Sequence, residues 1–179
     1  MKPRDTIERF DTYLHKRGLR LEAVVIGGAA LELLGIVSRS TRDCDILVPD
    51  LSEQLLDAAR AFAGATRTDG EHLDDDWLNN GPASLVRDLQ VGWQDRLVPA
   101  FSGHSIVLRS LGRLDLLGSK LFALCDRALD LADCVALAPT LAELDGLRAW
   151  LEERDTNPDW PAHVHATLND LKLRLGHGA

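Results

Sequence analysis

Hydrophobic and polar positions in the first part of the chain switch between helical and extended spacing. Ile7, Phe10 and Leu14 recur at intervals of three and four residues, the period of a helix that buries one face. The run LEAVVIGG is apolar and rich in β-branched residues, as in a buried strand that ends in a tight turn. We therefore expect, in order, a helix (6–16), a strand (21–28), a short helix (29–34), a second strand (43–48) and a helix with glycine at its C-terminal end (51–64).

The pattern is weaker in the middle of the chain and becomes wholly helical towards the C-terminus. Residues 65–81 are polar, acidic and rich in turn-forming residues, which predicts a loop. Two further strands are expected within 88–101 and 104–111, with a turn at Gly103 between them. The remaining apolar spacing predicts helices at 111–128, 130–138, 140–155 and 159–176.

These elements predict an α/β (α+β) fold, with helices flanking a mixed β-sheet and a helical C-terminal half. The α/β core is expected over 1–110, and a helical part over 111–179 is expected to pack on it. The change near residue 110 is interpreted as a structural boundary within one unit, since no linker separates the two parts. Thr140 and Glu143 have the spacing of a capping box, which marks the start of one of the C-terminal helices.

Composition and charge narrow the classes of function. A chain of 179 residues that is 45% hydrophobic fits one domain, or a compact core with a helical appendage. Its net charge of −8 argues against a broad surface that grips nucleic-acid phosphates, but it is compatible with a local basic patch. The N-terminus does not have the pattern of a signal peptide, and no apolar run reaches the roughly 20 residues that span a bilayer. A cytoplasmic protein without a membrane partner is therefore expected.

The spacing of the cysteines and tryptophans does not indicate a second functional site. Cys44, Cys125 and Cys134 have neither CxxC nor zinc-ligand spacing, so we expect small buried side chains in a reducing compartment. Trp77 follows the acidic loop, and its ring could either stack on a base or pack in the core.

The motif with the clearest chemistry is Asp43-Cys44-Asp45 on the second predicted strand. Side chains alternate along a strand, so Asp43 and Asp45 share one face, and Cys44 points to the other. Two neighbouring carboxylates repel each other unless a cation lies between them, and their oxygens suit Mg²⁺ or Mn²⁺. Such a cation would also bind substrate phosphates. Taken alone, the pair could equally be an exposed strand face without a function.

Two glycines upstream of Asp43 and Asp45 strengthen the functional interpretation of the two aspartates. Gly27 and Gly28 end the preceding strand and open the short helix, where glycine lets the backbone approach an anion. Alone, they could form a tight turn and nothing more. The succession of strand, two glycines, short helix and a strand with D-x-D is much rarer than either motif.

The combined motif resembles that of a known superfamily. Gly27-Gly28-Ala29 followed by RSTRDCD (39–45) is similar to the GG/GS…R-x-T-x-D-x-D signature of minimal nucleotidyltransferases of the polymerase-β-like superfamily. WLNNGPASLV (77–86), KLFAL (120–124) and the DRALDLAD that follows are most similar to an uncharacterised branch related to AbiEii-type toxins. The resemblance covers most of residues 20–140 and implies a nucleotidyltransferase-like fold.

The resemblance also implies roles for individual residues. Asp43 and Asp45 would be catalytic and ligate Mg²⁺ or Mn²⁺. The nucleotide would be held by residues from both halves of the chain, namely Gly27, Gly28, Ala29, Arg39, Thr41, Lys120, Asp130 and Asp133. Lys120 would also be catalytic and reach a phosphate, while Asp130 or Asp133 would orient Lys120 or Arg127. From the residues alone, Lys120 could instead be a solvated helix lysine, and Asp130 could cap a helix.

One part of the superfamily's pattern lacks a clear counterpart. Enzymes that extend nucleic acids usually carry a third carboxylate on a later strand. The candidates are Asp88 and Asp95, although Asp95 could simply pair with Arg96.

The sequence therefore predicts transfer of a nucleoside monophosphate from a nucleoside triphosphate to an acceptor. The acceptor could be an RNA end such as that of tRNA, a protein hydroxyl or a small molecule. By resemblance, the protein could be a toxin with a cognate antitoxin as its partner. The alternative is a catalytically inactive module of the same fold that binds a nucleotide or a protein partner.

Overall fold

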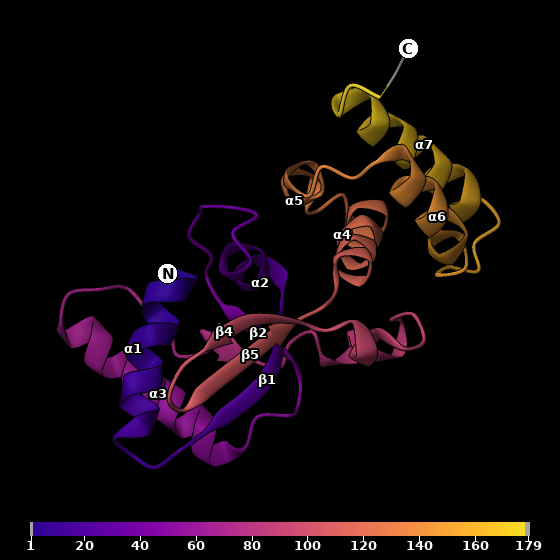
Figure 1. The fold of residues 1–179 in the computed structure, drawn as a ribbon. Coiled ribbons are helices and arrows are strands. Elements are labelled where there is room, and N and C mark those ends of the chain that lie inside the picture. Colours follow the sequence, from indigo (N-terminus) through magenta and orange to yellow (C-terminus); the bar gives the residue numbers. More distant parts are fainter. Residues whose placement is uncertain (1, 178–179) are drawn as a thin grey trace. The chain divides into compact units, whose positions relative to one another are not determined.

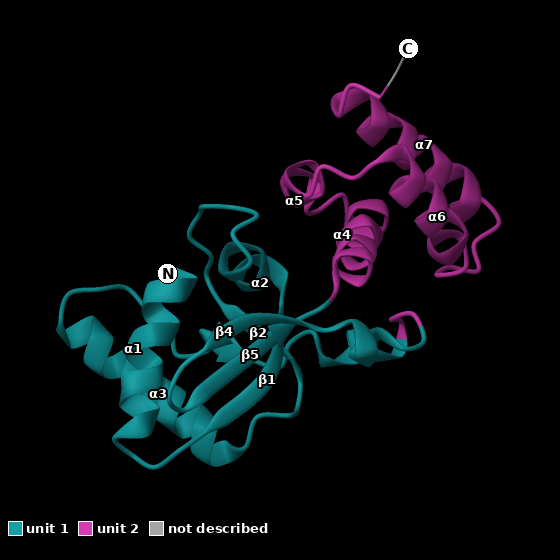
Figure 2. Ribbon diagram, viewed as in Figure 1, with its two compact units in different colours: residues 1–87, 91–111 teal, residues 88–90, 112–179 magenta. Residues whose placement is uncertain are grey.

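The computed structural model describes residues 2–177 and divides the chain into two compact units (Figure 2). One consists of residues 1–87 and 91–111 and is called the α/β unit; the other consists of residues 88–90 and 112–179 and is called the helical unit. No helix of the described residues is long and apolar enough to cross a membrane.

The α/β unit contains the sheet and the first helices of the chain (Figure 1). Its elements are α1 (Pro3–His15), β1 (Leu21–Ile26), α2 (Gly27–Leu33), β2 (Cys44–Val48), α3 (Glu53–Thr68), β3 (Leu78–Asn79), the 3₁₀ helices η1 (Ala83–Arg87) and η2 (Trp93–Arg96), β4 (Val98–Ser102) and β5 (Ile106–Ser110).

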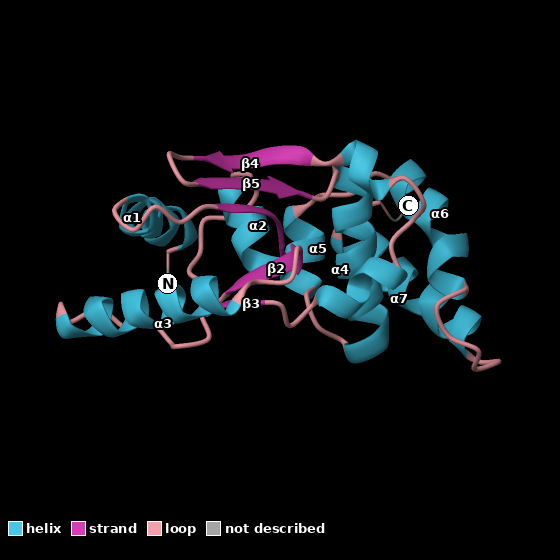
Figure 3. Cartoon of the chain, turned by 90° about the horizontal axis from the view of Figure 1, so that it is seen from below, coloured by secondary structure: helices cyan, strands magenta, loops and turns pink. Residues whose placement is uncertain are grey.

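The five strands form one mixed sheet in the order β3-β2-β1-β5-β4 (Figure 3). At its centre, β1 is antiparallel to β2 and parallel to β5. The outer strands add a parallel pair, β2 with β3, and an antiparallel hairpin, β4 with β5. The predicted fold class, a mixed sheet flanked by helices with a helical C-terminal half, is confirmed.

The core of the α/β unit lies on the face of the sheet that α1, α2 and α3 cover. Val25, Cys44 and Ile46 are all fully buried in this core. Phe10 packs edge-on against Trp77, with their ring centroids 5.1 Å apart. Because side chains alternate along a strand, the burial of Cys44 and Ile46 turns Asp45 to the other face of β2.

A buried carboxylate joins α1 to the β4–β5 hairpin. Asp11 is only 4% exposed and accepts hydrogen bonds from the backbone N–H groups of Ser105 at 2.8 Å, Ile106 at 2.7 Å and His104 at 3.0 Å. Burial raises the pKa of Asp11, but the three N–H donors and the charge of His104 lower it by more, so the pKa lies below its ordinary value. Gly103 lies so close to this carboxylate that a Cβ would clash with it.

The helical unit contains α4 (Arg113–Arg127), α5 (Leu131–Ala136), α6 (Leu141–Glu152) and α7 (Trp160–Arg174). Each lies within one of the four predicted helical segments. Leu117, Leu144 and Leu151 are fully buried within the unit, as are Val164 and Leu171. Helical periodicity placed one apolar stripe on each helix, and these stripes meet to form the core of the unit.

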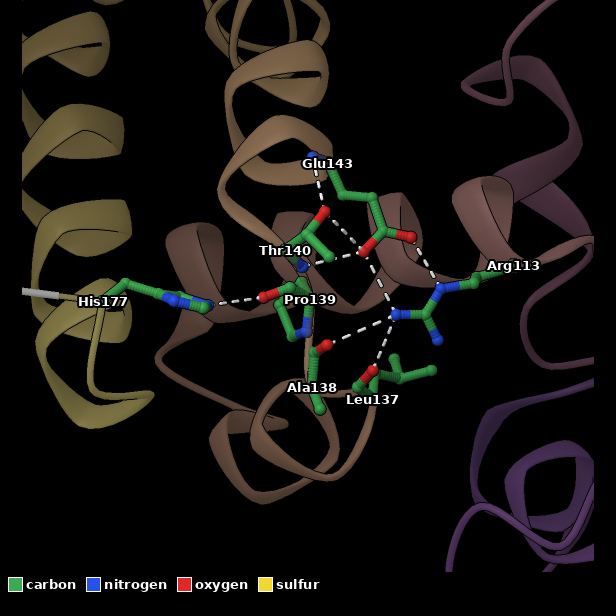
Figure 4. A network of polar contacts seen from close by, with 7 residues as sticks. All are labelled: Arg113, Leu137, Ala138, Pro139, Thr140, Glu143 and His177. Carbon is green, nitrogen blue, oxygen red and sulfur yellow. Dashed lines mark hydrogen bonds and ion pairs between the residues drawn. The ribbon is translucent and has the colours of Figure 1, made fainter.

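The loop between α5 and α6 is fixed by the predicted capping box and by an arginine (Figure 4). Thr140 accepts a hydrogen bond from the Glu143 backbone, and the Glu143 carboxylate accepts one from the Thr140 backbone at 2.8 Å. Arg113 donates to Glu143 at 2.6 Å and to the Leu137 carbonyl at 2.9 Å. The hydrogen bond from Arg113 is the main reason that the pKa of Glu143 falls to about 2.

Several predicted elements have other bounds than expected; the first helix, for example, begins at Pro3, and the first strand ends at Ile26, before the two glycines. The helix predicted to stop at Gly64 continues to Thr68, because Gly70, with φ of +86°, is the glycine that takes the left-handed position after the helix. The segment 88–101 is not one strand: Gly92 is also left-handed, η2 follows it, and extended structure begins only at Val98. The predicted loop 65–81 also contains the short strand β3.

Replacing Asp11 with alanine should lower the free energy of unfolding by about 3 kcal/mol, because it leaves three backbone donors without their acceptor. Asp57→Ala, which removes an exposed carboxylate paired with Arg60, should cost less than about 1 kcal/mol. Both values can be measured by urea denaturation.

The Asp11 contribution should also depend on pH in a defined direction. Because folding lowers its pKa, the carboxylate stabilises the fold above the ordinary value of 3.8 and less so as the pH falls below it. The stability difference between wild type and Asp11→Ala should therefore shrink between pH 6 and pH 3. A difference that stays constant over this range would contradict the account.

Candidate functional site

The predicted glycine turn and the D-x-D strand lie against each other in the α/β unit. Ile26, the last residue of β1, pairs with Asp45 in the antiparallel register of β1 and β2. The next residue, Gly27, has φ of +72°, and a Cβ placed on it would lie 2.7 Å from Asp45 Oδ2. The carboxylate of Asp45 therefore occupies space that only glycine leaves open.

The Thr41 side chain lies between Gly28 and Asp43. A Cβ on Gly28 would lie 3.1 Å from Thr41 Oγ1. The same hydroxyl donates to Asp43 Oδ1 over 3.5 Å, a long hydrogen bond. The structure thus brings together five of the predicted site residues, namely Gly27, Gly28, Thr41, Asp43 and Asp45.

The two carboxylates of the D-x-D motif flank a buried cysteine. Cys44 lies between Asp43 and Asp45 in sequence, with its thiol fully buried on the opposite face. Burial raises the pKa of this thiol, and the negative charges of Asp45 and Asp43 raise it further. Asp43 and Asp45 are themselves half-buried, so their charges are only partly screened by water.

The remaining predicted residues of this region lie in α2 and in the loop that follows it. Ala29 is 1% exposed, with its methyl group in the core. The helix α2 has seven residues, so its dipole at Gly27 is that of a short helix. Arg39 lies exposed in the loop between α2 and β2.

The WLNNGP segment supports the end of β2 through residues to which the sequence assigned no role. Asn79 pairs with Asp45 in the parallel register of β2 and β3. Asn80 donates to the carbonyls of Ile46 and Pro49, both at 3.0 Å, and accepts from the Leu51 backbone at 2.7 Å. Asn80 therefore fixes the chain as it leaves β2.

Trp77, from the same segment, is fully buried, and its Nε1 donates to the Ala59 carbonyl at 3.2 Å. Its role is to pack in the core, and the alternative of stacking on a base is wrong.

Neither candidate for the third carboxylate lies on a strand. Asp88 belongs to the helical unit, where Arg154 donates to its carbonyl at 3.0 Å. Asp95 is exposed in η2. Residues 98–110, which form β4, β5 and their turn, include no Asp or Glu. Among residues 2–177, no group of three or more His, Cys, Asp and Glu could hold a metal ion. The role of Asp43 and Asp45 as metal ligands stays a prediction.

The predicted site residues of the C-terminal half form a cluster of their own in the helical unit. Lys120 is 6% exposed, and its Nζ lies 3.0 Å from Asp130 Oδ2 and 2.8 Å from Asp133 Oδ2. Asp133 is 1% exposed, and Asp130 precedes α5 with φ of +65°. The ion pairs join α4 to α5, which gives Lys120 a structural role within its unit. Its contact with a nucleotide phosphate stays a prediction.

All three cysteines are buried and unpaired, as expected. Burial raises the pKa of Cys125 to about 11 and that of Cys134 to about 12. Their thiols are therefore protonated at neutral pH and are not nucleophiles.

Lys120→Met should lower the free energy of unfolding by about 3 kcal/mol, because it leaves the buried carboxylate of Asp133 without its cation. Lys172→Met is the matched control: Lys172 pairs with the more exposed Asp145 at 2.9 Å, and its loss should cost less than about 1 kcal/mol. Equal, small losses for both variants in urea denaturation would show that the Lys120 cluster has no structural role.

The sequence of the chain matches a family of known proteins. Residues 5–153 match the model of a family described as "Nucleotidyltransferase of unknown function (DUF6036)". Comparisons with curated proteins and with solved structures gave no match. The family match supports the expected nucleotidyltransferase relationship, whereas the AbiEii-related branch stays a prediction. Because the match covers most of the chain and includes Gly27, Asp43, Asp45 and Lys120, the protein belongs to this family of nucleotidyltransferases of unknown function.

Proposed function

We propose that the protein transfers a nucleoside monophosphate from a nucleoside triphosphate to an acceptor, with Mg²⁺ or Mn²⁺ held by Asp43 and Asp45. The observation that carries this proposal is the contact between the Asp45 carboxylate and Gly27, with Thr41 placed between Gly28 and Asp43. The family match supports nucleotidyl transfer in general.

The donor set fits a hard divalent cation. Asp43 and Asp45 offer carboxylate oxygens two residues apart, on either side of the buried Cys44. Mg²⁺ in enzymes is commonly held by one or two carboxylates, with its other ligands supplied by water and substrate phosphates. When bound, the cation would neutralise phosphate charge and polarise the phosphorus–oxygen bond.

The glycine turn supplies the neighbouring phosphate site. Gly27 and Gly28 have no side chain, so a phosphate can come close to their backbone. The Thr41 hydroxyl, beside Gly28, can donate to a phosphate oxygen if it turns away from Asp43. Arg39, exposed in the same loop, adds a positive charge that can reach the triphosphate.

A second candidate function is a nucleotide-binding module without catalysis. The absence of any acidic residue from 98–110 favours it, because the strands beyond β1 then offer no carboxylate to take the proton of an attacking hydroxyl. Calorimetry distinguishes the two: binding of a triphosphate without any turnover supports the module, and transfer activity excludes it.

The resemblance to AbiEii-type toxins extends the proposal to a cellular role. A toxin that modifies an essential acceptor would stop growth on expression, and a cognate antitoxin would bind and neutralise it. If this role is correct, expression of the wild type arrests growth and expression of Asp45→Asn does not. Arrest by both proteins would rule out nucleotidyl transfer as its cause.

Asp45→Asn should reduce nucleotidyl transfer roughly 100-fold or more, because the amide is a much weaker ligand for the cation. Transfer is measured with an α-³²P-labelled nucleoside triphosphate, Mn²⁺ and cell extract. Asp50→Asn changes a nearby exposed carboxylate beyond β2 and should leave labelling intact. Equal labelling by wild type and Asp45→Asn would contradict the proposal.

Gly27→Ala should weaken nucleotide binding for a steric reason, because the new methyl group would lie only 2.7 Å from Asp45 Oδ2 and displace that carboxylate. Gly35→Ala is the matched control: Gly35 has nearly the same φ of +73°, but a Cβ there has no neighbour within 4 Å. Each variant should lose about 1 kcal/mol of stability to backbone strain.

Only Gly27→Ala should also weaken the binding of Mn²⁺ with a non-hydrolysable triphosphate, by at least roughly tenfold in calorimetry. Equal affinities for the two variants would show that the contact between Gly27 and Asp45 does not shape the site.

A further inference from the structure

Two adjoining cavities open beside the candidate site in the α/β unit. The first, about 440 Å³, lies between α1, α3 and the loops around Ser40 and His72. The second, about 550 Å³, is lined by residues 40–42 and 72–74. They share Ser40, His72 and Leu73, and the second reaches Thr41, the residue beside Gly28 and Asp43. The cavities are therefore continuous with the residues proposed to bind phosphate, and their size suits a small organic molecule.

A buried hydroxyl in the wall of the first cavity lacks a hydrogen bond. Thr66, on α3, is 4% exposed, and its Oγ1 has no partner among the described residues. Burying a hydroxyl without a partner costs free energy, and threonine within a helix usually bonds to the carbonyl four residues earlier. By contrast, Thr68 on the same helix donates to the Gly64 carbonyl at 3.1 Å. Thr66 is thus a group that a bound polar molecule would satisfy.

The charges around the cavities balance. Lys2 and Arg9 line the first cavity together with Asp5 and Glu71, and Arg9 is bound to Glu71 at 2.6 Å. In the second cavity, Arg42 is matched by Asp74. A lining of this kind has no net field to attract a polyanion such as RNA, whose binding depends on excess positive charge.

The lining also argues against the base of a nucleotide. Phe62 lines the first cavity but is only 5% exposed, because its ring packs against other aromatic rings of the core, those of Phe10, Tyr13 and Trp77. Little of the ring is therefore open to stack on a base. The cavities are lined by four residues with hydroxyl groups, Thr6, Ser40, Thr41 and Thr66, among charged residues of both signs in equal number.

We propose that these cavities bind the acceptor, and that the acceptor is an uncharged, hydroxyl-rich small molecule such as a sugar or polyol. The inference rests on the proposed nucleotidyl transfer and names its substrate class. A hydroxyl oxygen of the acceptor bonds to the α-phosphorus as the bond from that phosphorus to the β-phosphate oxygen breaks. Pyrophosphate leaves, and the hydroxyl proton passes to water. Thr66 positions the acceptor by hydrogen bonding to another of its hydroxyls.

The test supplies an α-³²P nucleoside triphosphate and Mn²⁺ with one of three acceptor fractions from an extract of the protein's own cells: neutral molecules of low mass, total RNA or total protein. A labelled product other than the triphosphate should form with the neutral fraction and with neither of the others. Thr66→Val keeps the shape of the side chain and removes the unpaired hydroxyl, so it should fold as stably as wild type. The amount of neutral fraction that gives half-maximal transfer should rise roughly tenfold in this variant. Thr68→Val, on the same helix, should leave this half-maximal amount unchanged.

The possible results separate this inference from the proposed function. Label on RNA or protein, or equal acceptor dependence of wild type and Thr66→Val, overturns the acceptor site but leaves nucleotidyl transfer intact. A wild-type protein that transfers label to none of the three fractions overturns both, whether or not it binds the triphosphate.

Discussion

The contact between a carboxylate and a bare backbone position is the constraint on which the candidate site depends. Asp45 Oδ2 lies only 2.7 Å from where a Cβ on Gly27 would be, and the antiparallel pairing of Ile26 with Asp45 fixes this approach. A Cβ at Gly27 would displace the carboxylate, and a shift of register by one residue would turn Asp45 into the core. The same pairing sets the glycine turn beside the D-x-D motif, so one strand pair positions both the proposed cation site and the proposed phosphate site.

The rest of the α/β unit holds this strand pair in place. On the far side of β2, Asn80 binds two carbonyls and one N–H group of the chain leaving the strand. On the far side of β1, Asp11 ties α1 to the hairpin that contains β5, the parallel neighbour of β1. Both side chains replace water at buried backbone groups, so each stabilises the sheet without contacting the proposed ligands.

The parts of the structure that the sequence predicted are those set by local pattern. Strands β1 and β2, the helices of the C-terminal half and the Thr140–Glu143 cap follow from spacing over a few residues. Helix ends were harder: Gly64 and Gly70 are both plausible stops, and only the left-handed backbone at Gly70 decides between them. The roles of Asp11, Asn80 and Thr66 could not be predicted, because they depend on groups distant in sequence or on the absence of a partner.

The central claim is that Asp43 and Asp45 hold a divalent cation against a triphosphate bound at Gly27 and Gly28. The most direct measurement is a crystal structure of the protein with Mn²⁺ and a non-hydrolysable nucleoside triphosphate, with manganese located by its anomalous scattering. The account predicts a manganese peak between the carboxylates of Asp43 and Asp45, with phosphate oxygens completing its coordination. A bound triphosphate without manganese at these two residues, or manganese at other residues, would contradict it.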